Sequence, residues 1–67
     1  MAKKHYSITT AGPRGNAFNI MGEVTRAMRN EGKTPEEIEA YTNEAMSSDY
    51  SNLVYVSKLK MNELNNE

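Results

Sequence analysis

Residues 12–32 read GPRGNAFNIMGEVTRAMRNEG, a turn followed by a stretch with the periodicity of an amphipathic helix. Two glycines and a proline favour a tight turn at the start, and Asn16 is a typical N-cap residue. Apolar side chains then recur every three or four residues and share one helix face: Ala17, Ile20, Met21, Val24, Ala27 and Met28. Gly32 stands where helices commonly end on a glycine. The pattern predicts a helix over residues 17–31.

A second helix is predicted over residues 35–46, because its start carries a full set of N-terminal signals. Thr34 is an N-cap, Pro35 takes the first helical position and Glu37 completes a capping box. The predicted buried stripe consists of Ile38, Tyr41, Thr42, Ala45 and Met46. The short connection Gly32-Lys33 predicts that the two helices are near-antiparallel neighbours.

The C-terminal segment has two interpretations. Ser48 or Asp49 can cap a helix that begins near Tyr50. One face of that helix would carry Tyr50, Leu53, Val54, Ser57, Met61 and Leu64. A run of β-branched and aromatic residues inside the segment is instead typical of a strand, which would cover residues 53–61. The cap residues favour the helix, and the strand is the alternative.

The N-terminal residues 3–10 predict one strand. They alternate loosely, with Tyr6, Ile8 and Thr10 on one side, and they are rich in β-branched residues. A lone strand leaves its backbone groups unpaired, so we expect a second strand or a second subunit beside it. The predicted fold class is therefore α+β and mostly helical, with one N-terminal strand followed by two or three short helices (β-α-α-α). We expect a single small domain over residues 1–67.

Composition indicates that this domain assembles as an oligomer. Isoleucine, leucine, valine and phenylalanine together number ten in 67 residues, which is little material for a core. The chain has no cysteine and no zinc-ligand pattern, so neither a disulfide nor a metal is expected to stabilise it. The remaining common remedy is a homo-oligomer. The sequence has no transmembrane-length apolar run and no signal peptide, which favours a soluble, cytoplasmic protein without membrane contact.

Charge is distributed unevenly along the chain. Residues 1–30 carry a net charge of +4, whereas residues 31–67 carry a net charge of −5, although the total is only −1. This asymmetry indicates that one region favours anions, or that the two regions pair across subunits. Nucleic acid is not an expected partner, because the isoelectric point of about 5.8 opposes a broad basic surface.

Two blocks of the sequence resemble a group of small proteins from phage and prophage genomes. The first block, Gly12 to Gly22, contains Gly-Pro-x-Gly-Asn-Ala-Phe, and the second, Ala45 to Leu53, contains Ser-x-Asp-Tyr-x-x-Leu. The resemblance spans about residues 6–56. It implies a viral origin, a location in the host cell and a compact unit of one strand and several helices, but no particular activity. Members of the group often carry an acidic residue where this chain has Arg14.

The turn before the first helix is the candidate binding site. Backbone N–H groups at a helix start carry a partial positive charge, and Arg14 can add a bidentate phosphate contact. We expect Gly15 and Asn16 to supply the backbone groups and Asn19 a further hydrogen bond. Tyr6 or Tyr50 would stack on a base.

Catalysis is not expected, and no catalytic residue, metal site or cofactor is predicted. His5 is the only histidine and has no cysteine to act with, while the glutamates of the second helix lack ligand spacing. The predicted function is a non-enzymatic binding protein that assembles and sequesters an anionic, nucleotide-like ligand such as a host-defence signal. The alternative is a small inhibitor that binds a host protein through its acidic helix or an apolar surface.

Overall fold

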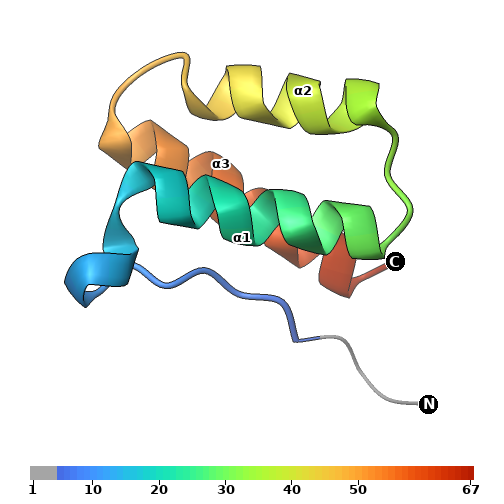
Figure 1. The fold of residues 1–67 in the computed structure, drawn as a ribbon, viewed down its shortest axis with the longest axis horizontal. Helices are drawn as coiled ribbons and strands as arrows, with labels where there is room; N and C mark the ends of the chain where they lie inside the picture. Colours follow the sequence, from blue (N-terminus) through green and yellow to red (C-terminus); the bar gives the residue numbers. More distant parts are fainter. Residues whose placement is uncertain (1–4) are drawn as a thin grey trace.

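Three helices follow a short 3₁₀ turn in the computed structural model, which describes residues 5–67 (Figure 1). The elements are η1 (Gly12–Gly15), α1 (Ala17–Asn30), α2 (Pro35–Ala45) and α3 (Tyr50–Asn65). α3 packs against both other helices, which contact each other less. The two predicted helices are confirmed to within one residue at each end. The strand alternative for residues 53–61 is wrong, because α3 is helical throughout.

Side-chain caps fix the start of each helix as the sequence predicts. Asn16, Thr34 and Asp49 each accept a hydrogen bond from the backbone N–H three residues later, at 2.8, 3.2 and 3.0 Å. The Glu37 carboxylate accepts the Thr34 N–H at 3.0 Å, which completes the capping box. Gly32, with φ of +77°, ends the first helical segment in the left-handed region that favours glycine.

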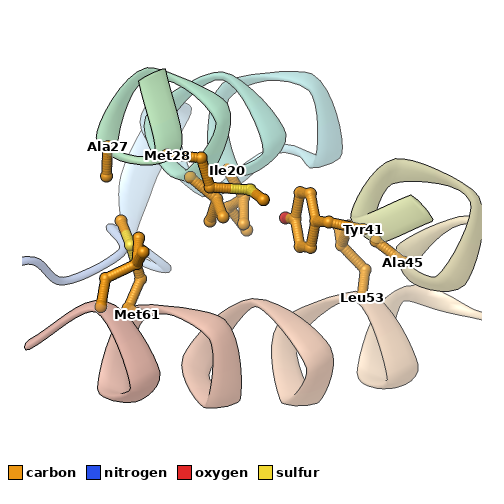
Figure 2. Close-up of a cluster of buried hydrophobic side chains, with 9 residues drawn as sticks. Ile20, Ala27, Met28, Tyr41, Ala45, Leu53 and Met61 are labelled. Carbon is orange, nitrogen blue, oxygen red and sulfur yellow. The ribbon is translucent and has the colours of Figure 1, made fainter. Parts of the chain in front are cut away.

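The core lies between the three helices, whose apolar side chains point toward one another (Figure 2). Its buried members are Ile20, Val24, Ala27, Met28, Tyr41, Ala45, Leu53, Met61 and Leu64. The only polar side chain that is fully buried in the described residues is Ser57, which shares a 2.6 Å hydrogen bond with the Tyr41 hydroxyl. Burial raises the pKa of the Tyr41 phenol above its ordinary value, and the bond to Ser57 offsets part of that rise.

The N-terminal segment is extended but pairs with no strand, so the predicted α+β class is wrong. No β-strand occurs in residues 5–67, and the described domain is all-helical. Helix side chains take the place of a strand partner. The Asn65 amide accepts the Tyr6 N–H at 2.7 Å and donates to the Tyr6 carbonyl at 2.9 Å. The Glu23 carboxylate accepts the backbone N–H of Thr9 at 2.9 Å and its hydroxyl at 3.0 Å.

The alternation in this segment nevertheless has a structural basis. Tyr6 and Ile8 are half-buried and pack against the core, while His5 and Ser7 are exposed. Residues 5–8 therefore present one face to the helices, whereas Thr9 is half-buried and Thr10 is exposed, so the predicted alternation ends there. The segment runs alongside the helices in Figure 1. Residues 3 and 4, which the predicted strand included, lie outside the described residues. Among the residues that the structure describes, no helix is long and apolar enough to cross a membrane.

Candidate functional site

The turn predicted as an anion site has a structural reason for each of its glycines. Gly12 has φ of +68°, a conformation that other residues rarely adopt. A Cβ on Gly15 would lie only 2.5 Å from the Thr10 carbonyl oxygen, so the chain passes itself too closely for any other residue. The turn joins the extended segment to α1, and both glycines serve that connection.

Five of the six predicted binding residues belong to this turn or adjoin it. The Tyr50 hydroxyl at the start of α3 donates to the Gly15 carbonyl, which ties the turn to the third helix. The Asn16 side chain is occupied as the cap of α1, and its Nδ2 donates to the Pro13 carbonyl at 2.9 Å. Asn19 is half-buried in the first turn of α1. The Arg14 backbone lies in η1, while its side chain is outside the described part of the structure.

Tyr6, the remaining predicted binding residue, lies elsewhere. Its hydroxyl donates to the Glu31 carboxylate at 2.7 Å, beyond the opposite end of α1 from the turn. This hydrogen bond is the main reason why the pKa of Tyr6 is raised, since it favours the protonated phenol. The structure therefore does not bring Tyr6 to the turn.

An exposed apolar surface beside the turn escaped the sequence reasoning. Phe18 is 82% exposed, Met46 62% and Tyr50 46%, and they border a hollow of about 240 Å³. We call this surface the apolar end, and its apolar lining consists of Ala17, Phe18, Met21, Ala45, Met46, Tyr50 and Leu53. Met46 was predicted to be buried, and that prediction is wrong, because Met46 is the C-cap of α2 and is exposed.

One sequence signal could have located the apolar end. Phe18 is the only phenylalanine of the chain, and it stands one position away from the apolar stripe that begins at Ala17. An aromatic residue off the stripe of a well-formed amphipathic helix points away from the core. The sequence alone does not place α3 and the α2–α3 loop beside it, and those elements supply the rest of the surface.

The outer faces of α1 and α2 carry opposite charges. On α1, Arg26 and Arg29 are exposed, and neither forms an ion pair with another described residue. On α2, the exposed side chains near the N-terminus include Glu36, Glu37 and Glu39. Two ion pairs of the described residues lie elsewhere, at Lys33–Glu67 and Lys60–Glu63. The charge asymmetry of the sequence thus becomes two neighbouring helix faces of opposite sign.

Within residues 5–67, no three histidine, cysteine, aspartate or glutamate side chains gather where they could hold a metal ion. Comparison of the chain with protein-family models, with curated proteins and with solved structures gives no match. The candidate functional site is therefore defined by its geometry: an apolar hollow, an exposed aromatic ring and a neighbouring turn.

Proposed function

We propose that this chain is a non-enzymatic binding protein that associates with a second copy of itself through the apolar end. The observation that carries the proposal is the 82% exposure of Phe18 beside an apolar hollow of about 240 Å³. Aromatic anchors that fill a pocket on the partner supply most of the energy in many protein interfaces. Single exposed apolar residues are common on protein surfaces, whereas an exposed ring that adjoins other exposed apolar side chains is typical of an interaction surface.

The size of the hollow favours a protein side chain over a small molecule. Pockets for small ligands commonly enclose roughly 300–1,000 Å³. The hollow, at about 240 Å³, lies below that range, and most of the residues that line it are apolar. A phenyl ring suits such a space, whereas a nucleotide brings a sugar and phosphates that need polar partners.

A second copy is the occupant that the chain itself supplies. Each copy carries both the exposed Phe18 ring and the hollow, which is the self-complementarity that a two-fold interface requires. The core supports the same conclusion, because it holds only nine buried hydrophobic residues in the described part of the chain. Small domains without disulfides or metals commonly gain stability by association.

The apolar end is large enough for the centre of an interface but not for all of it. The exposed parts of Phe18, Met46 and Tyr50 amount to roughly 400 Å², judged from typical areas of buried aromatic side chains. A stable interface buries about 800 Å² on each partner. The remaining contact must come from polar surfaces around the apolar end.

Sedimentation equilibrium of the wild type, Phe18→Ser and Tyr55→Ser tests the proposal. Burying a phenylalanine contributes about 1.5–3 kcal/mol, so losing two rings that are 82% exposed in the free chain removes roughly 2.5–5 kcal/mol per dimer. That loss corresponds to a dissociation constant about 70- to 5,000-fold higher. Tyr55 is 65% exposed on α3 and lies outside the apolar end. The Tyr55→Ser variant is therefore the matched control and should associate like the wild type.

Two results would contradict self-association. One is a wild-type chain that sediments at 7.5 kDa throughout a concentration series. The other is a Phe18→Ser variant that associates as strongly as the wild type. Circular dichroism melts of dilute samples should be nearly the same for both chains, because an exposed ring contributes little to the stability of the single copy.

The nucleotide-like ligand stays a prediction. What supports it is the grouping of Gly15, Asn16, Asn19 and Tyr50 at the start of α1, next to the surface where we propose that two copies meet. Calorimetric titration of linear and cyclic nucleotides into the wild type and Arg14→Ala tests it. Binding that weakens about tenfold or more in Arg14→Ala would support the ligand, and the absence of binding to the wild type would remove it.

A further inference from the structure

On the outer faces of α1 and α2, the exposed residues are apolar at one end of each helix and charged at the other. On α1, Phe18, Gly22 and Arg29 follow one another on the exposed face, so this face runs from apolar to basic. On α2, Glu36 and Glu39 are exposed near the N-terminus and Met46 follows as the C-cap, so this face runs from acidic to apolar. Because the two helices run in opposite directions, their apolar parts share one end of the bundle and their charged parts the other (Figure 1).

Gly22 leaves the backbone of α1 uncovered on this face. Glycine is the least favourable residue after proline in a helix interior. A Cβ placed on Gly22 would meet nothing within 4 Å among the described residues, so no neighbour in the same copy requires a glycine there. A glycine at this point lets a helix of another molecule approach the backbone of α1 closely.

We infer that two copies pack with α1 of one copy against α2 of the other, in a two-fold arrangement that places Phe18 over Met46 and Arg29 over Glu36. This inference rests on the proposed function and names the geometry of the association. A two-fold axis parallel to the helices produces it, because the rotation keeps each end of the bundle in place while α1 of one copy takes its position over α2 of its partner. Each contact then occurs twice.

The spacing of the residues fits this register. Phe18 and Arg29 are 11 residues apart, about 16.5 Å along a helix, and Glu36 and Met46 are 10 residues apart, about 15 Å. The two separations differ by about one residue rise, so both ends of the contact can be satisfied together. Opposite charges that meet in this way fix the register of an interface and discourage the reverse orientation.

Charge-swap variants test the inference. Arg29→Glu alone and Glu36→Arg alone each place like charges together twice per dimer, and each should raise the dissociation constant about tenfold or more. The double variant Arg29→Glu/Glu36→Arg restores opposite charges and should associate within about threefold of the wild type. Lys58→Glu, a reversal of the same size at an exposed position on α3, is the matched control and should have little effect.

Rescue by the double variant separates an interface from a general effect on the fold. Arg29 lies in the last turn of α1 and Glu36 in the first turn of α2, where each charge is favourable to its helix dipole. The double variant loses both favourable effects, so a change in helix stability alone would make it the weakest of the three. Restored association therefore requires that the two side chains meet.

The outcomes distinguish this inference from the proposed function. If single and double charge variants associate equally weakly, or if none differs from the wild type, the α1-on-α2 register is wrong. The dependence of association on Phe18 can survive that result, because it is measured with variants that leave every charge in place. If Phe18→Ser also leaves association unchanged, the proposed function fails as well.

Discussion

Replacing Asn65 by alanine tests how the N-terminal segment is held without a strand partner. The Asn65 amide forms two hydrogen bonds to the backbone of Tyr6, at 2.7 and 2.9 Å, in partly buried surroundings. Such bonds contribute about 0.5–1.5 kcal/mol each, so their loss weakens the attachment of the segment by about 1–3 kcal/mol. Hydrogen exchange of the Tyr6 amide should then become roughly 5- to 150-fold faster.

Amide exchange followed by nuclear magnetic resonance measures this effect at single residues. Asn66→Ala is the control, because among the described residues the Asn66 side chain donates only to the Asn62 carbonyl of α3. The Thr9 amide should keep most of its protection in Asn65→Ala, since the Glu23 carboxylate holds it independently. Exchange of the Tyr6 amide is expected to be independent of protein concentration.

Two observations would refute this reasoning. Unchanged protection of the Tyr6 amide in Asn65→Ala would mean that the side-chain contact does not hold the segment. Protection that increases with protein concentration would mean that the segment pairs with another copy, as a strand at a subunit junction would. The second result would restore the strand that the sequence predicted.

Three further predictions concern the core, the turn and alkaline pH. Val24→Asp should unfold the chain, because Val24 is fully buried and an unpaired carboxylate there has no partner; a cooperative melt at the wild-type temperature would contradict this. Gly15→Ala should lower the melting temperature, because the added Cβ meets the Thr10 carbonyl at 2.5 Å, and an unchanged melt would contradict it. The free energy of unfolding should fall as pH rises above about 10, because the Tyr41 phenol has a raised pKa in the folded chain and loses its proton first in the unfolded chain. Chemical denaturation at several pH values should show a smaller fall in the free energy of unfolding for Tyr41→Phe than for the wild type.

The helices could be predicted because their signals are local. Asn16, Thr34 and Asp49 act as caps through hydrogen bonds to residues three positions away, which a sequence pattern contains in full. The same local signal at Asp49 correctly outweighed the β-branched residues of α3. Val54 and Val56 are half-buried against the core, so packing on the other helices overrides their preference for strands.

The all-helical class could not be predicted because its decisive contacts are remote and polar. The sequence showed correctly that Tyr6 and Ile8 face one way, but the partners of the segment are Glu23 and Asn65. Nothing in a pattern of apolar residues marks a carboxylate or an amide as the partner of a distant backbone. The general expectation that an extended segment needs a strand beside it therefore led to the wrong class.

The candidate site was predicted in part for similar reasons. The turn and the residues of the first helical turn are neighbours in sequence, and they lie together. Tyr50 joins them through its bond to Gly15, whereas Tyr6 lies with Glu31 at the other end of α1. Choosing between two tyrosines required the direction of the extended segment along the bundle. The exposure of Phe18 likewise depends on which helices leave that face uncovered.

The most direct test of the account is an isotope-filtered nuclear Overhauser experiment on a mixture of labelled and unlabelled wild-type chains. This experiment detects only proton pairs that belong to different copies. We expect contacts between the Phe18 ring of one copy and the Met46 methyl group of the other. The same contacts should remain in the control variant Tyr55→Ser. The contradicting result is the absence of any contact between copies from the Phe18 ring, in a sample at a concentration where sedimentation shows that the chain associates.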